Sequence, residues 1–189
     1  KRVYYWQNIA RTITEVEENG TLLGSASLPF GYQSVIRAIG FDPAEGRIIA
    51  PHGAVESQSI EAGFSHIEPG VGIESTELFD FDAQLRMSMF LGFEVSADSY
   101  WVLGPTASVD EIVQIDRATL TVVDNFVLPG SSGQTYRGLA RDPDTGIFYT
   151  NFNDEEIRAL TLPEPGAAAG VLALATLSVR ARRRGLLRG

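Results

Sequence analysis

One pattern occurs three times along this chain and restricts what the chain can fold into. The segment RAIGFDPAEGRII at residues 37–49 returns as RGLARDPDTGIFY at residues 137–149. A looser copy, FLGFEVSADSYWV, covers residues 90–102, so the copies begin 53 and 47 residues apart. Periods of this length are typical of repeat architectures in which each repeat forms one small structural unit.

Each copy has the chemistry of a β-hairpin. A short apolar strand ends in Asp-Pro at residues 42–43 and again at 142–143. Proline fixes φ for the turn, and the aspartate side chain can accept hydrogen bonds from nearby backbone N–H groups. Gly46 and Gly146 allow the positive φ that closes the turn. We therefore expect strands near 37–41, 91–95 and 137–141, each the innermost of its sheet and paired with the strand that follows.

A second hairpin is expected after each of the first ones. Residues 111–123 alternate apolar and polar side chains on both sides of a turn at 116–118. Similar patterns cover 12–28, with a turn at 18–21, and 78–89, with a turn near 82–83, and half of one covers 156–162. Two hairpins make one four-stranded antiparallel sheet.

These units predict an all-β protein, an incomplete β-propeller of four-stranded antiparallel blades over residues 1–162. The partial or complete blades are expected at 1–29, 36–90, 91–129 and 136–162, with 51–76 as a long Gly- and Glu-rich insertion. A β-sandwich or meander with similar turn residues is the alternative. Because a closed propeller needs about four to eight blades, we expect further blades and an export signal to precede this chain. The last blade lacks an outer strand, which we expect the amino-terminal segment to supply in the intact protein, where it would close the ring.

The charge is divided unevenly along the chain. Residues 1–162 carry 10 Lys and Arg against 23 Asp and Glu, whereas residues 163–189 carry five Arg and one Glu. An acidic body repels phosphate backbones, which argues against nucleic-acid binding. The chain has no cysteine, so it has no disulfides, thiolate metal sites or cysteine nucleophiles.

The carboxyl-terminal residues have three features in a fixed order. Pro163, Glu164 and Pro165 precede a run of small and apolar residues, and the cluster Arg180, Arg182, Arg183 and Arg184 follows that run. This order resembles the PEP-CTERM sorting signal, which would cover residues 163–189 with a short hydrophobic transmembrane helix at about 166–179. The resemblance implies export and processing near Pro163–Pro165 by an exosortase, a membrane-embedded cysteine transpeptidase. It also implies a periplasmic, cell-surface or extracellular destination and an association with exopolysaccharide.

The physical properties of the tail agree with a temporary anchor. Fifteen helical residues from 165 to 179 would extend only about 22 Å, which is short of a hydrocarbon core of about 30 Å. The arginine cluster keeps its side of the membrane cytoplasmic, so the acidic body faces outward. Two alternatives are an ordinary carboxyl-terminal membrane anchor and a buried Ala-rich helix with a solvated basic end.

Candidate residues for chemistry are few. His52 and His66, the only histidines, fall within 51–76 and are weak candidates for a metal site, since no HExxH spacing or third ligand accompanies them. Histidines in loops are more often solvated. Five glutamates crowd the same region and could bind Ca²⁺, although no DxDxDG loop is present: Glu56, Glu61, Glu68, Glu74 and Glu77. We therefore expect a binding or structural module of unknown ligand, with no cofactor and no catalytic residue. An exported, metal-dependent propeller hydrolase of a lactonase-like kind is the alternative.

Overall fold

A computed structural model describes most of the chain before residue 163 and one short segment after it. The described residues are 2–7, 12–17, 19–28, 36–54, 59–68, 71–85, 87, 89–106, 108–133, 135–162 and 177–180. Within these ranges, no helix has the length and apolar character that would be needed to cross a bilayer. The predicted all-β class is confirmed.

The described strands form four antiparallel sheets in chain order. The first sheet has the order β1 (Arg2–Gln7), β2 (Thr12–Glu17) and β3 (Leu22–Ser27). The second contains β4 (Gly40–Asp42), β5 (Arg47–His52), β6 (Gly63–Glu68) and β7 (Gly72–Leu78). The third contains β8 (Gly92–Val95), β9 (Ser99–Pro105), β10 (Asp110–Asp116) and β11 (Thr121–Val127). The fourth contains β12 (Tyr136–Arg141), β13 (Phe148–Phe152), β14 (Glu156–Leu160) and β15 (Leu177–Arg180).

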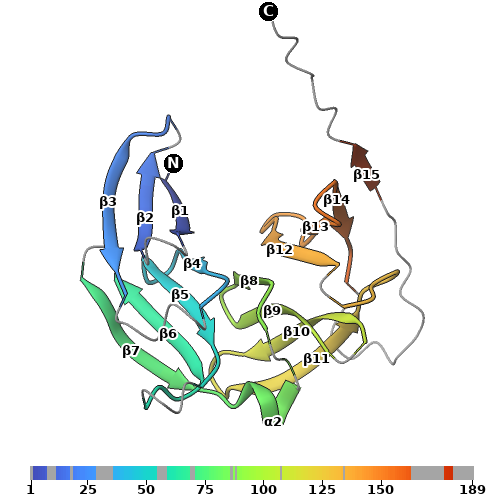
Figure 1. Ribbon diagram of the computed structural model, residues 1–189, viewed down its shortest axis with the longest axis horizontal. Coiled ribbons are helices and arrows are strands. Elements are labelled where there is room, and N and C mark those ends of the chain that lie inside the picture. Colours follow the sequence, from blue (N-terminus) through green and yellow to red (C-terminus); the bar gives the residue numbers. More distant parts are fainter. Residues whose placement is uncertain are drawn as a thin grey trace, which may run out of the picture.

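The sheets follow one another around an arc, and the first strands of the last three sheets lie innermost (Figure 1). β8 contacts both β4 and β12, and the N–H of Gly138 donates to the carbonyl of Leu91 over 2.7 Å. β4, β8 and β12 each pair with the strand that follows. The predicted innermost strands and their pairing are thus confirmed.

The repeated turns form as the sequence predicts. Asp42 and Asp142 each accept, through Oδ1, a hydrogen bond of 2.9 Å from the backbone N–H two residues later. Gly46 and Gly146 both have φ of 71° and donate to the carbonyls of these aspartates. The aspartate therefore holds one side of the turn while glycine supplies the left-handed residue on the other.

Apolar side chains fill the spaces between successive sheets. One cluster joins the first and second sheets and includes Ile13, Ile36, Ile48 and Ile67. A second joins the second and third sheets and is rich in aromatic rings, among them Phe64, Phe81, Phe93 and Tyr100. A third joins the third and fourth sheets and includes Trp101, Phe126, Tyr136 and Phe148. The core is therefore distributed over the sheet interfaces, and this packing holds each sheet against its neighbours.

The second sheet corrects one prediction. Residues 51–76 are not an insertion, because they include the end of β5, all of β6 and most of β7, the second hairpin of this sheet. Residues 78–89 are not a hairpin either: Phe81–Leu85 forms a short helix, α2. Asp80 caps this helix, since its Oδ1 accepts a hydrogen bond of 2.9 Å from the N–H of Ala83. The expected turn residues thus begin a helix.

The predicted transmembrane helix of the tail is not confirmed. Of the predicted transmembrane helix at 166–179, residues 166–176 lie outside the described residues, and residues 177–179 belong to β15. β15 pairs antiparallel with β14, whose outer edge would otherwise leave backbone groups unpaired. The fourth strand of the last sheet comes from the tail in this chain. The supply of this strand by the amino-terminal segment in the intact protein stays a prediction.

The close approach of the third and fourth sheets yields a prediction at Gly92. A Cβ atom at this position would lie 2.7 Å from the backbone nitrogen of Leu139 and 2.8 Å from the carbonyl carbon of Gly138. We expect Gly92→Ala to lower the free energy of unfolding by about 1–3 kcal/mol, because the sheets must move apart to admit the methyl group. Urea denaturation measures this loss. Gly24→Ala is the control, because no atom lies within 4 Å of the position that its methyl group would occupy, and an equal loss in both variants would contradict the prediction.

Candidate functional site

The two histidines lie on strands and are buried, so their predicted position in an exposed loop is wrong. His52 ends β5 and is fully buried, with Nε2 2.9 Å from Oγ of Ser65. Ser65 in turn lies 3.0 Å from Oγ1 of Thr76, hydroxyl to hydroxyl. His66 lies on β6 and is 5% exposed. Both histidines are buried because β6 pairs with a strand on each side, β5 and β7, and this pairing was not predicted from the sequence.

The structure does not bring the two histidines together. Ser65 and His66 are successive residues of one strand, so their side chains point to opposite faces of the sheet. His52 bonds to Ser65 and therefore shares its face, the one that packs on the first sheet through Ile67. His66 faces the third sheet together with Phe64. A joint metal site for the two histidines is thus excluded by the alternation of the strand.

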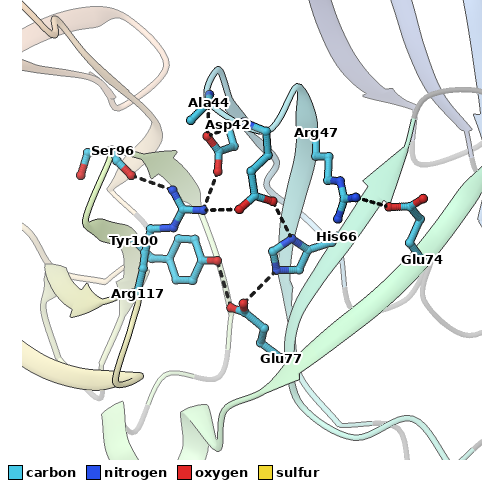
Figure 2. Close-up of polar contacts among 10 residues, drawn as sticks. Asp42, Ala44, Arg47, His66, Glu74, Glu77, Ser96, Tyr100 and Arg117 are labelled. Carbon is cyan, nitrogen blue, oxygen red and sulfur yellow. Dashed lines mark hydrogen bonds and ion pairs between the residues drawn. The ribbon is translucent and has the colours of Figure 1, made fainter.

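His66 belongs to a group of polar side chains that we name the inter-sheet polar cluster (Figure 2). The second sheet contributes residues from β4, the turn after it, β6 and β7, and the third sheet contributes the start of β9 and the turn after β10. Its members are Asp42, Glu45, His66, Glu77, Tyr100 and Arg117. Of these residues, only His66 and Glu77 were predicted as candidates from the sequence, and Asp42 was assigned to its turn alone.

Arg117 joins the two sheets. Its Nη2 donates to Oδ2 of Asp42. Asp42 is buried, with only 1% of its surface exposed. The same nitrogen lies 3.5 Å from Oε1 of Glu45, and Nη1 donates to the carbonyl of Ser96 over 3.0 Å. The guanidinium also lies 5.1 Å from the centre of the Tyr100 ring. One arginine thus satisfies a buried carboxylate of the neighbouring sheet and covers an aromatic ring of its own sheet.

His66 lies between two carboxylates of its own sheet. Its Nε2 is 3.3 Å from Oε1 of Glu77, and its Nδ1 is 3.9 Å from Oε2 of Glu45. Glu77 also accepts a hydrogen bond of 3.0 Å from the hydroxyl of Tyr100, which carries the contact across to the third sheet. Figure 2 shows the imidazole beside Glu77, with Tyr100 and Arg117 on the facing sheet. Glu77 thus links the imidazole of its own sheet to the hydroxyl of the facing sheet.

Electrostatics fix the roles of two cluster members. Burial raises the pKa of Tyr100 above its ordinary value, and the neighbouring Glu77 carboxylate raises it further. Burial lowers the pKa of Arg117, but the bond to Asp42 and the charge of its neighbours more than offset this, so the net shift is upward. Tyr100 therefore remains a hydrogen-bond donor and Arg117 a cation at neutral pH.

The remaining acidic candidates are dispersed. Glu61 and Glu68 lie near the two ends of β6, whereas Glu74 on β7 pairs with Arg47 at 3.2 Å. The pKa of Glu68 is raised because it shares a hydrogen bond with Glu74 and faces its charge. Among the described residues, no three His, Asp or Glu side chains are placed to hold a metal ion together. Glu56 lies outside the described residues.

A cavity of about 590 Å³ opens where β5 leads into β6, at the end of β5 away from Asp42. Among its lining residues, Ile60 and Phe79 are buried, whereas Glu61 and Asp80 are exposed. Ser59, which also lines it, has a left-handed φ of 54°. A hollow lined by both apolar residues and acidic residues can hold a small molecule that has an apolar face and hydrogen-bond donors. No motif in the sequence indicates this cavity.

The predicted sorting residues fall almost entirely outside the described part of the chain. Pro163, Glu164 and Pro165 lie outside the described residues, as do Arg182, Arg183 and Arg184. Arg180 is described, as the last residue of β15.

The burial of His52 gives a pH prediction. Burial lowers the pKa of His52 from its ordinary value of 6.5, and a bond to the Gly53 carbonyl only partly opposes this. The folded chain therefore binds fewer protons than the unfolded chain below about pH 6.5, so stability falls as the pH drops from 6.5 toward the folded pKa. We expect His52→Gln to remove part of this slope, by up to about 1.4 kcal/mol per pH unit. Urea denaturation of both proteins between pH 5 and 8, a range set by histidine titration, measures the difference. Parallel profiles would contradict the prediction.

The chain was compared with known proteins. No family model and no curated protein matches it. Several solved structures resemble it at low identity, and three of them are described here. The Dos1 propeller has a TM-score of 0.44 at 9% identity and matches 90% of this chain and 55% of its own. The β-propeller domain of Cps50 (Swd1) from Myceliophteria thermophila has a TM-score of 0.44 at 10% identity, over 94% of this chain and 72% of its own.

The third structure is an oxidoreductase (glucose dehydrogenase) of Thermus thermophilus. Its TM-score is 0.38 at 13% identity, and the match covers 76% of this chain and 49% of that protein. This chain thus spans about half the length of the Dos1 propeller and of the oxidoreductase.

Proposed function

We propose that this chain belongs to an exported protein with a β-propeller body that is processed by an exosortase and serves as a binding or structural module. The observation that carries the proposal is the order of features in the tail: Pro163–Pro165, an apolar run and the arginine cluster that starts at Arg180. The proposed destination is the periplasm, the cell surface or the extracellular space.

The architecture of the body supports the propeller part of the proposal. Four-stranded antiparallel sheets follow one another around an arc, with β4, β8 and β12 at its inner side (Figure 1). Apolar clusters occupy each sheet-to-sheet interface, as expected for radially stacked blades. The first and last sheets end the arc, and further blades would complete the ring.

The charge distribution supports the proposed partners. The body is acidic and the tail is basic, so the arginine cluster would remain at the anionic cytoplasmic side of the inner membrane while the body faces outward. The proposed partners are exosortase, the inner membrane for a limited time, and exopolysaccharide or another surface polymer. Hydroxyl-rich polymers suit the cavity beside Ser59, because its lining residues include Glu61 and Asp80, whose carboxylates are hydrogen-bond acceptors.

The test is expression of the full-length protein, tagged in its body, in strains with and without the host exosortase. We expect a shorter, released product only in the strain that has the enzyme. The double variant Glu164→Ala/Pro165→Ala should remain uncut and membrane-bound in both strains. Glu155→Ala, a change at an exposed turn, is the matched control and should be processed normally. Equal size and location in both strains would remove the sorting proposal.

A further inference from the structure

The outer edge of β14 is a docking site for an extended peptide segment, and the tail of this chain occupies it. Ile157 lies opposite Val179, and Ala159 lies opposite Leu177, in one continuous antiparallel register. Glu156 lies opposite Arg180, so the register covers all four residues of β15.

Under the proposed function, residues 177–179 of β15 also belong to the membrane helix. A helix over 166–179 requires Leu177, Ser178 and Val179 to bond along their own segment. In β15 these residues bond to β14 instead. A residue cannot satisfy both patterns at once, so pairing with β14 and insertion into a membrane exclude each other.

We propose that the tail exchanges between two sites, the edge of β14 and the membrane, and that docking on β14 withholds the sorting segment from the bilayer. The membrane half of this proposal rests on the proposed function, whereas the docking half rests on the strand register alone. When the tail leaves, the edge of β14 is free to accept another extended segment by strand addition.

Two features indicate that the tail binds only weakly at each of the two sites. β15 contains only four residues, and an outer strand of this length holds few ladder hydrogen bonds. The apolar run before it is dominated by alanine and glycine, so its transfer into a bilayer is also only weakly favourable. Neither site therefore holds the tail permanently, and a modest bias shifts the population.

The experiment uses a lock that the chain makes possible, because it contains no cysteine. The double variant Ile157→Cys/Val179→Cys places two thiols on directly opposed residues, and Ile157 is 51% exposed, so the core is not disturbed. Purified full-length protein is mixed with vesicles of phosphatidylethanolamine and phosphatidylglycerol and then sedimented, once oxidised and once reduced. We expect a disulfide to form readily, and we expect oxidation to reduce vesicle binding at least about tenfold relative to the reduced form, a shift of about 1.4 kcal/mol.

Two control variants separate the outcomes. Ile157→Cys/Leu177→Cys is out of register and should oxidise poorly, since diagonal positions lie too far apart for a disulfide. Glu111→Cys/Val127→Cys locks β10 to β11, away from the tail, and should bind vesicles equally in both redox states.

Failure of the 157–179 disulfide to form would overturn the docking of the tail on β14. Equal binding of its oxidised and reduced forms would overturn the exchange. Absence of binding in the reduced form would overturn the membrane half, and the proposed function with it, while leaving the docking result intact.

Discussion

Replacing Arg117 with methionine should lower the free energy of unfolding by about 3–5 kcal/mol, the cost of leaving a buried charge without its partner. The side chain of Asp42 is 2% exposed and that of Arg117 is 14% exposed. Without the guanidinium, the Asp42 carboxylate keeps the hydrogen bonds of its own turn but loses its ion pair with the third sheet. Urea denaturation at pH 7 measures the loss.

The matched control is Arg47→Met. Arg47 pairs with Glu74 at 3.2 Å, but these side chains are 40% and 28% exposed, so this pair should contribute only about 0–1 kcal/mol. The double variant Asp42→Asn/Arg117→Met should recover part of the stability, because it removes the stranded charge. Equal losses for Arg117→Met and Arg47→Met would show that the contact does not hold the sheets together.

Replacing Asp110 with alanine should cost about 2–5 kcal/mol, because it leaves two buried N–H groups without their acceptor. Asp110 begins β10 and is fully buried. Its Oδ2 accepts hydrogen bonds from the backbone N–H groups of Thr135 at 2.8 Å and Tyr136 at 3.1 Å, where β12 of the next sheet begins. A single carboxylate oxygen therefore positions the start of the fourth sheet on the third.

Two further variants test this role of Asp110. Asp110→Asn keeps an acceptor oxygen and should cost less than alanine. Asp124→Ala removes a half-buried carboxylate of β11 that accepts a hydrogen bond from the N–H of the next residue, Asn125, which is exposed. This change should alter stability by less than about 0.5 kcal/mol. Native-state hydrogen exchange should show the loss of protection at Thr135 and Tyr136 in Asp110→Ala alone. Unchanged protection at these two residues would contradict the assignment.

The residues of the Asp-Pro turns predicted the hairpins in which these turns lie. The Asp-Pro turns with Gly46 and Gly146 placed the innermost hairpins of the second and fourth sheets correctly, because aspartate capping and positive φ act within four residues. The second hairpin of the second sheet was missed. Its outer strand β7 carries two glutamates, and its register with β6 shifts between His66 and Ile67, so the alternation that marks a strand is interrupted there.

The contacts between sheets could not be predicted from local patterns. Asp42 and Arg117 are 75 residues apart, and nothing in either turn identifies the other as its partner. His66 was assigned to a loop because the strand around it was not recognised. Likewise, the small and apolar composition of the tail favours a helix, whereas residues 177–180 pair with β14, an edge defined only once the fourth sheet has formed.

The most direct test of the proposed export and processing is the intact mass of the protein released by cells that contain the exosortase. The proposal predicts a chain that ends at or near Pro163–Pro165 and lacks the arginine cluster. It also predicts that cells without the enzyme retain the uncut protein in the membrane fraction. A released protein whose mass includes every residue to Gly189 would contradict the proposal.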